Sequence, residues 1–220
     1  MSDNYNNDLI TPDPVLRAAE GDGVPAEADI YDFDKTIVPF DSGTLFIFYC
    51  MRRYPGLIFR TVPGFLYGFM RYATVDKSMT LLKAYAFDFI DRIPLDEAVR
   101  DFWDRYEKDV YFWARPERRE RYSVIITASP DFLIKEIASR LRFDDVISTK
   151  HDLRTGAVVG RNVHDREKVR LFRERYPDTK VVNVYSDSID HDKYIFTLAQ
   201  RCYHIEKGRR IQFDFEHKYS

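Results

Sequence analysis

The chain has 220 residues, with 34 basic and 36 acidic side chains, and its formal net charge is −2. This length suits one large domain, or one domain with an insert, and is enough to bury a sizeable core. The balanced charge excludes a nucleic-acid binder that depends mainly on phosphate contacts, because there is no basic excess.

The two cysteines, Cys50 and Cys202, form neither a CxxC pair nor a zinc-ligand spacing. A disulfide framework and a structural zinc site are therefore not expected, and a reducing, cytoplasmic setting is predicted. The first residues have no basic region followed by an apolar one, so a secretory signal is not expected either. No apolar run reaches the roughly 18 residues that a membrane-spanning helix needs.

Residues 1–26 predict a flexible leader, because they combine five acidic residues, three prolines and two glycines. A short strand from Ala28 to Asp32 follows, and Asp34 comes two residues later. Ligands of parallel sheets bind beyond the carboxyl ends of the strands, so Asp32 is expected in that crevice. Two carboxylates this close repel each other, and a divalent cation such as Mg²⁺ relieves the repulsion. Taken alone, such a pair is more often a solvated acidic turn, so the later segments of the chain decide between the two interpretations.

Aromatic residues concentrate between Phe40 and Trp113, where 19 of the 34 in the chain occur, with helical spacing and few strand signals. Prolines at 55, 63 and 94 divide this stretch into helices. The clearest are expected from Lys77 to Asp91 and from Leu95 to Tyr111. The sequence therefore predicts an all-helical insert.

Beyond the insert, strands and helices alternate. The expected elements are strands at Tyr122 to Ile126, Asp145 to Ser148, Val181 to Tyr185 and Cys202 to Ile205, helices at Phe132 to Leu141, Asp165 to Tyr176 and Asp192 to Arg201, and a small hairpin from His151 to Asn162. This alternation predicts an α/β fold with a parallel sheet and right-handed crossovers.

Three of the expected strands end in polar side chains. Asp32 and Asp34 follow the first strand, Thr127 follows the second, and the run from Ser186 to Asp192 follows a later one. Lys168 lies near the start of the helix before that run. In a parallel sheet these residues meet at one edge.

In order, these four segments resemble the four motifs of the haloacid-dehalogenase-like phosphohydrolases, over about Asp29 to Lys207. The helical insert resembles the C1-type cap of the phosphoserine-phosphatase-like branch. The resemblance implies a doubly wound, Rossmannoid parallel-sheet core formed by residues 27–40 and 116–220. An all-helical cap would occupy residues 41–115.

The resemblance also implies the reaction. Asp32 is the expected nucleophile, which forms an aspartyl-phosphate, and Asp34 the general acid and base. Mg²⁺ is expected between Asp32, the Asp34 carbonyl and Asp187, where it neutralises charge on the transferring group.

The remaining roles concern the phosphoryl group. Thr127 and Lys168 are expected catalytic residues that also bind it, and Ser129 is a further substrate-binding residue. The last motif ends in an acidic residue behind the metal ligands. Asp192 suits that position better than Asp190, although both remain open.

Three features depart from the family pattern. In the last motif, the residue four positions after Asp187 is His191, so Asp192 fits only a spacing that is one residue longer. Lys35 and Ser186 stand where the family often has glycine. Lys35 adds a positive charge at the lip of the site and leaves both aspartates in place.

The function predicted from these residues is Mg²⁺-dependent hydrolysis of a phosphomonoester. The alternatives are a phosphotransferase on the same fold, a hydrolase of lipid-linked phosphate at the membrane surface, and a non-catalytic module that binds a phosphorylated ligand. Nucleic acid is not an expected partner. The sequence leaves open which phosphomonoester is bound and how many copies of the chain associate.

The stretch from Leu57 to Tyr72 is apolar nearly all round, with Arg52, Arg53, Arg60 and Arg71 nearby. The preferred interpretation is packing within the cap, because aromatic helices usually belong to a core. The alternative is a shallow contact with a membrane surface through apolar residues and arginines. The insert also resembles the caps of phosphatidylglycerophosphate phosphatases, which favours the alternative.

Overall fold

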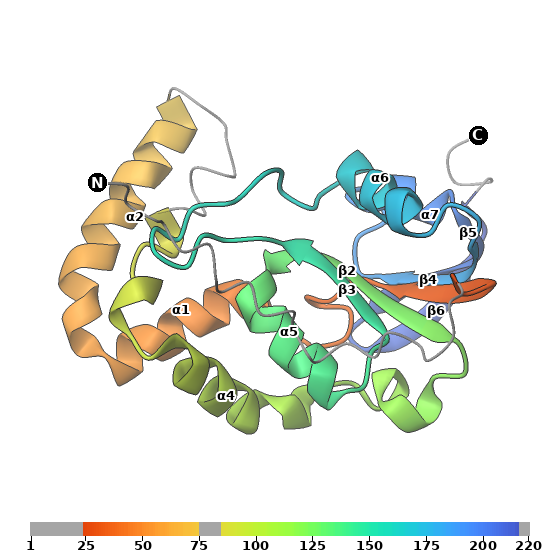
Figure 1. The fold of residues 1–220 in the computed structure, drawn as a ribbon, viewed down its shortest axis with the longest axis horizontal. Coiled ribbons are helices and arrows are strands. Elements are labelled where there is room, and N and C mark those ends of the chain that lie inside the picture. The colour runs from red at the N-terminus through yellow and green to blue at the C-terminus, as the bar shows by residue number, and fades with distance from the viewer. Residues whose placement is uncertain (1–23, 75–84, 216–220) are drawn as a thin grey trace, which may run out of the picture.

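The computed structural model describes residues 24–74 and 85–215 (Figure 1). Most of the expected leader, and residues 77–84 of the first expected cap helix, lie outside these ranges. No helix in the described ranges is long and apolar enough to cross a membrane.

A six-stranded sheet forms the centre of the molecule, in the order β3-β2-β1-β4-β5-β6 (Figure 1). Its strands are β1 Glu27–Tyr31, β2 Tyr122–Pro130, β3 Asp145–Thr149, β4 Lys180–Ser186, β5 Ala199–Glu206 and β6 Arg209–Phe213. Strands β1 to β5 run parallel to one another, and β6 is antiparallel to β5. The predicted α/β class with a mainly parallel sheet is confirmed.

The central strands are buried on both faces of the sheet. In β2, Val124, Ile125 and Ile126 are almost completely inaccessible, and Ala28 and Ile30 in β1 are equally buried. A parallel sheet covered by helices on both sides requires such continuous apolar runs. These runs therefore set which strands take the centre of the sheet.

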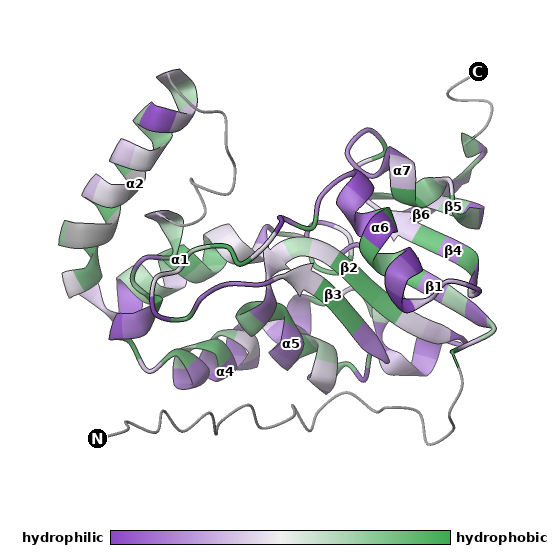
Figure 2. Ribbon diagram, turned by 45° about the horizontal axis from the view of Figure 1, so that its top comes forward, coloured by the Kyte–Doolittle hydropathy of each residue, from purple (hydrophilic) through white to green (hydrophobic). Residues whose placement is uncertain are grey.

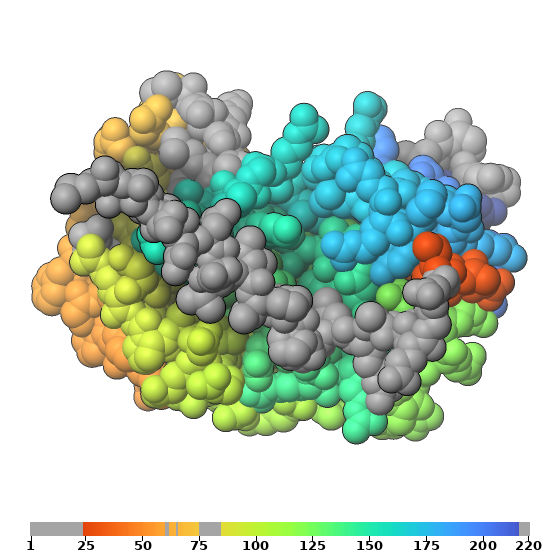
Figure 3. All heavy atoms as spheres, in the orientation of Figure 1, coloured from red at the N-terminus to blue at the C-terminus, as the bar shows by residue number. Residues whose placement is uncertain are grey.

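Helices cover the sheet, and several of them lie in the described chain between β1 and β2. The α-helices are α1 Ser42–Arg53, α2 Ile58–Thr74, α4 Leu95–Tyr106, α5 Asp131–Arg140, α6 Arg166–Arg175 and α7 Lys193–Phe196, with 3-10 turns at Pro55–Leu57, Ile90–Arg92, Glu107–Asp109, Phe112–Ala114 and Pro116–Arg118. Helices α1, α2 and α4 gather at one end of the molecule, away from β5 and β6 (Figures 1 and 3). Between β1 and β2 the described chain contains helices and no named strand, as predicted.

The helical end and the sheet share one hydrophobic core. Phe46 of α1 packs edge to face on Phe102 of α4, with ring centroids 5.4 Å apart. Trp103, the next residue of α4, is fully buried, and its indole N–H donates to the Leu133 carbonyl in α5 at 2.8 Å. Because Phe33 of the β1–α1 loop stacks edge to face on Trp103, α4 is packed close to the loop that carries the aspartates.

The C-terminal elements differ from the prediction. The helix expected from Asp192 to Arg201 is wrong in extent, since α7 stops at Phe196 and β5 already begins at Ala199. The backbone of β5 pairs in parallel with β4 from Ala199 onward, which a helix there would prevent. The strand β6 was not predicted, because its Arg-rich sequence is exposed at the edge of the sheet.

Two further boundaries were placed incorrectly. The helix expected to reach Tyr111 ends at Tyr106 and continues as 3-10 turns. The expected hairpin from His151 to Asn162 forms one isolated antiparallel bridge, between His151 and Val158. Its turn at Gly156 lies directly against the backbone of Phe87, so the loop ends in a contact with the helical region.

Candidate active site

Asp32 is held at the carboxyl end of β1 by three contacts. Its backbone N–H donates to the Tyr185 carbonyl of β4 at 2.9 Å. Its Oδ1 accepts from the Lys168 ammonium at 2.8 Å, and its Oδ2 accepts from the Thr36 hydroxyl at 3.2 Å. Since the side chain is 13% exposed, the carboxylate is fixed in orientation and still reachable from the crevice.

Lys168 is 4% exposed and lies in the first turn of α6. Its Nζ is 2.8 Å from Asp32 Oδ1 and 2.7 Å from Asp192 Oδ1. Burial lowers the pKa of this ammonium, but the charges of the two carboxylates outweigh burial and raise the pKa above its ordinary value. Lys168 is therefore a permanent positive charge between two aspartates.

Of the two candidate trailing acids, the structure brings Asp192 to the site. Asp192 is 5% exposed, and its Oδ2 accepts a 2.6 Å hydrogen bond from the Ser186 hydroxyl at the end of β4. Asp190 is exposed at the surface of the same loop. The one-residue-longer spacing therefore matches the observed contact with Lys168.

Asp34 is held from two different elements. Its Oδ1 accepts from the backbone N–H of Ser42, the first residue of α1, at 2.8 Å. Its Oδ2 accepts from the hydroxyl of Ser129, near the end of β2. The backbone N–H of Ser129 in turn donates to the Thr127 hydroxyl at 3.2 Å, so Ser129 links Thr127 to Asp34.

The carboxyl groups of the site have raised pKa values. Burial raises the pKa of Asp34 to about 6, assisted by the charge of Asp41 and opposed by the bonds from Ser129 and Ser42. Burial also raises the pKa of Asp32 to about 7, against the opposing charge of Lys168. Such shifts are common where a protein concentrates carboxylates for catalysis.

Asp187 lies beyond the end of β4, next to the aspartate loop. Burial raises the pKa of its carboxyl, and the positive charge of Lys35 opposes that rise. Lys35 itself has a φ of 57°, in the left-handed region that glycine adopts without strain. This backbone conformation explains why glycine would suit position 35, and here a lysine adopts it and supplies charge.

Two residues without a predicted role complete the site. The Thr36 hydroxyl donates to Asp32 Oδ2 and accepts from the Asp187 backbone N–H at 2.9 Å. Ser42 binds Asp34 through its backbone and lies 3.4 Å from the Ser129 hydroxyl through its own oxygen. The sequence signal for Thr36 is its place two residues after Asp34, whereas no motif in the sequence indicated Ser42.

The donor set fits a magnesium ion. No three side chains of His, Cys, Asp or Glu are grouped as a metal site in residues 24–74 and 85–215. The predicted site needs only the carboxylates of Asp32 and Asp187 and the carbonyl oxygen of Asp34, with substrate and water completing the shell. Burial raises the pKa values of three carboxyl groups, those of Asp32, Asp34 and Asp187, in a site that also holds the buried Lys168. A cation bound there would stabilise the ionised form of these carboxyl groups.

Residues 30–193 match the haloacid dehalogenase-like hydrolase family, and the chain belongs to it. No curated protein sequence matches it significantly. Among solved structures, it is similar to a protein of unknown function from Bordetella pertussis Tohama I, with 16% identity and a TM-score of 0.55 over 68% of this chain and 74% of that one.

A HAD family hydrolase from Salmonella enterica subsp. enterica serovar Typhi is 11% identical, with a TM-score of 0.50 over 73% of this chain and 56% of that one. A probable phosphoserine phosphatase from Vibrio cholerae is 12% identical, with a TM-score of 0.47 over 81% of this chain and 57% of that one. The chain thus spans a little over half of the Salmonella and Vibrio chains. At these identities, the likeness to the Bordetella and Salmonella structures concerns the fold alone.

Proposed function

We propose that this protein is a Mg²⁺-dependent phosphatase that hydrolyses a phosphomonoester through an aspartyl-phosphate on Asp32. One observation carries the proposal: the Asp32 carboxylate, at the end of the central strand, is fixed by Lys168 at 2.8 Å and by Thr36 at 3.2 Å. A nucleophile held in one orientation lowers the entropic part of the barrier to attack on phosphorus.

In the first step, an oxygen of Asp32 forms a bond to phosphorus while the bond from phosphorus to the substrate alcohol breaks. Protonated Asp34 donates its proton to the departing alkoxide. With a pKa of about 6, a useful fraction of Asp34 carries that proton near neutral pH. The products of this step are the free alcohol and a phosphorylated Asp32.

In the second step, Asp34 is a carboxylate and acts as a base. It takes a proton from a water molecule, whose oxygen attacks phosphorus, and the bond between phosphorus and Asp32 breaks. Inorganic phosphate leaves, and both aspartates return to their starting states. The same raised pKa serves both steps, because acid and base strengths are balanced near the working pH.

Thr127, Ser129 and Lys168 would bind the phosphoryl oxygens. Both hydroxyls come from the end of β2, beside Asp34, and Lys168 brings its charge from α6. Donors fixed before the reaction stabilise the negative charge that the phosphoryl group spreads over its oxygens. Asp192 would position Lys168 through their 2.7 Å contact.

Asp32, Asp187 and the Asp34 carbonyl would hold Mg²⁺, which offsets charge on the transferring group when bound. We further propose that residues 41–115 form a cap, that 27–40 and 116–220 form the core, and that the cap excludes water and selects the substrate. The edge-to-face contact of Phe33 with Trp103 of α4, with ring centroids 5.8 Å apart, supports direct packing of the cap against the loop that carries the site.

The test is release of inorganic phosphate from a panel of phosphomonoesters, with Mg²⁺ and with a chelator. Hydrolysis that needs Mg²⁺ and is independent of added alcohol is the expected result. Transfer to an added alcohol at the expense of free phosphate would show a phosphotransferase. Absence of turnover together with saturable ligand binding would instead identify a binding module.

A further inference from the structure

Helix α2 packs on the rest of the protein through its glycines. A Cβ atom placed on Gly68 would lie 2.6 Å from the Tyr85 ring, and one on Gly64 would lie 3.6 Å from Asp88 Oδ2. Tyr67 also stacks edge to face on Tyr85, with ring centroids 5.6 Å apart. Gly64 and Gly68 are four residues apart and share one face, so this glycine face is the side of α2 that contacts its neighbours.

The large apolar side chains of α2 lie on the opposite side. Two residues along an α-helix correspond to a rotation of about 200°, and Leu66 is two residues from both Gly64 and Gly68. The same helical rotation brings six large apolar residues of α2 into one continuous stripe on this side. It consists of Ile58, Phe59, Val62, Leu66, Phe69 and Met70, whose exposed fractions run from 38% for Val62 to 87% for Phe59.

This exposure overturns the preferred sequence interpretation, in which Leu57 to Tyr72 packs inside the cap. Leu57 is buried, but the stripe is not covered. Hydrophobic bands recur along α2 in Figure 2, at the edge of the molecule. A contiguous exposed apolar surface of this kind marks an interaction site.

The charge around the stripe indicates its partner. Residues 42–75 contain four arginines and no aspartate or glutamate. Arg53 is engaged by Glu97 at 2.6 Å and by Asp101 at 2.7 Å, whereas Arg52 is exposed and Arg71 is partly exposed. Arg71 lies seven residues from Gly64 and is therefore on the glycine side of α2, away from the stripe. Arg52 is four residues after the exposed Phe48 and shares the exposed face of α1 with it. The segment thus presents exposed apolar side chains and an exposed positive charge without a carboxylate of its own, and an anionic surface complements it.

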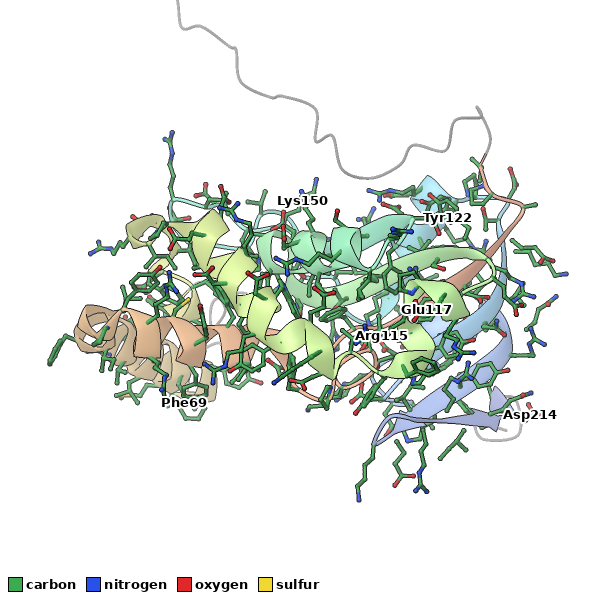
Figure 4. The ribbon with its side chains drawn as sticks, turned by 90° about the horizontal axis from the view of Figure 1, so that it is seen from below. Phe69, Arg115, Glu117, Tyr122, Lys150 and Asp214 are labelled. Atoms are coloured by element: carbon green, nitrogen blue, oxygen red, sulfur yellow. The ribbon has the colours of Figure 1, made fainter. Side chains whose placement is uncertain are left out.

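We propose that the α2 stripe docks on an anionic lipid membrane, with the helix lying in the plane of the headgroups. Phe59, Leu66, Phe69 and Met70 would enter the boundary between headgroups and acyl chains, and Arg52 would face anionic lipids. Figure 4 shows Phe69 at the rim of the molecule, at the opposite end from Asp214 after β6. Docking therefore leaves the far end of the sheet in water.

The experiment is co-sedimentation of the full chain with vesicles of phosphatidylcholine alone, or of phosphatidylcholine with phosphatidylglycerol. Wild type is expected to sediment with the anionic vesicles only. Leu66→Gln is expected to lower the partition coefficient about tenfold, because a large apolar side chain no longer enters the lipid. Arg52→Gln is expected to lower it about fivefold, with a weaker dependence on salt.

The matched control is Leu153→Gln, because Leu153 is 51% exposed and Leu66 is 56% exposed. It should bind vesicles like wild type, and all variants should keep the wild-type thermal unfolding curve and phosphate release from a soluble phosphomonoester. Vesicle binding is measured without turnover, so failure of the proposed catalytic function leaves this test intact.

Three outcomes would overturn the proposal. In the first, wild type stays in the supernatant with both vesicle types. In the second, Leu153→Gln loses as much binding as Leu66→Gln. In the third, the chain forms a dimer in solution that Leu66→Gln dissociates, with no vesicle binding, which would make the stripe an interface between copies.

Discussion

The hydroxyl of Thr36 accepts a hydrogen bond from the backbone N–H of Asp187, although 151 positions separate the two residues in sequence. The same hydroxyl donates a hydrogen bond to Asp32 Oδ2. Thr36 is completely buried. One side chain therefore sets the distance between the loop after β1 and the loop after β4, which carry the two proposed carboxylate ligands of the metal.

Replacing Thr36 with valine keeps the shape and removes the hydroxyl. We expect phosphatase activity to fall at least tenfold, and the free energy of unfolding to fall by about 1–3 kcal/mol, because the Asp187 N–H loses its acceptor. Thr36→Ser should restore most of both. Steady-state kinetics at several Mg²⁺ concentrations and denaturant unfolding measure these effects, and a fully active Thr36→Val would show that the link is dispensable.

Asp32→Asn should abolish turnover while the protein stays folded, because an amide of the same shape cannot attack phosphorus. Asp34→Asn should also be slow, but with p-nitrophenyl phosphate, whose leaving group needs little protonation, it should accumulate phosphorylated protein. Acid quench with a radiolabelled substrate distinguishes the two variants. Normal phosphate release by purified Asp32→Asn would disprove the proposed mechanism.

Asp192→Ala should lower both activity and stability, the latter by about 3 kcal/mol, because it removes one of the two carboxylates that compensate the buried Lys168 charge. Asp190→Ala, in the same loop but exposed, is the matched control and should change stability by less than about 0.5 kcal/mol. Thermal unfolding and kcat report the difference. If Asp190→Ala were the more damaging change, the exposed acid would have to replace Asp192 in the proposed roles.

The raised pKa of Asp34 predicts a pH dependence of stability in metal-free protein. Its pKa is about 6 in the folded chain, against 3.8 for an unperturbed aspartate, so folding binds a proton more tightly. The contribution of Asp34 to the free energy of unfolding is fully present below pH 3.8 and is lost as the pH rises through 6. Since each pKa unit corresponds to about 1.4 kcal/mol, the loss amounts to about 3 kcal/mol.

Asp34→Asn cannot ionise and should avoid that loss. With a chelator present, its free energy of unfolding relative to wild type should therefore rise by about 2–3 kcal/mol between pH 4 and pH 8. Urea unfolding at both pH values measures the change. Gln212→Ala, which replaces an exposed side chain that does not titrate, serves as the control. A pH-independent difference for Asp34→Asn would contradict the raised pKa.

The sequence predicted the parts of the fold that depend on long buried runs. The strands around Val124 to Ile126 and Val181 to Tyr185 were placed well, because burial on both faces leaves little choice of residue. The strand β6 was missed, since an exposed edge strand containing Arg209 and Arg210 has no apolar pattern to detect. The extent of α7 was missed because pairing of Ala199 with Val181 overrides local helix preference.

For the site, the sequence predicted which strand ends would meet. It could not predict contacts made by loop backbone, such as Ser42 N–H with Asp34 or Asp187 N–H with Thr36. The sequence also could not predict which side of α2 faces outward, because that side depends on the contact of Gly68 with the Tyr85 ring. The roles of Asp32, Asp34, Thr127, Lys168 and Asp187 remain predictions.

The central place of β1 has a consequence for how the chain folds during synthesis. Tyr31 pairs with Ile125 on one side and with Tyr185 on the other, so the ribosome must extend the chain by some 150 residues before the strand has both neighbours. Contacts this distant in sequence form slowly. The first half of a nascent chain would thus emerge as helices without a sheet, exposing apolar surface to chaperones and other chains. Asp32 would gain its contacts with Lys168 and Tyr185 only after α6 and β4 have left the ribosome.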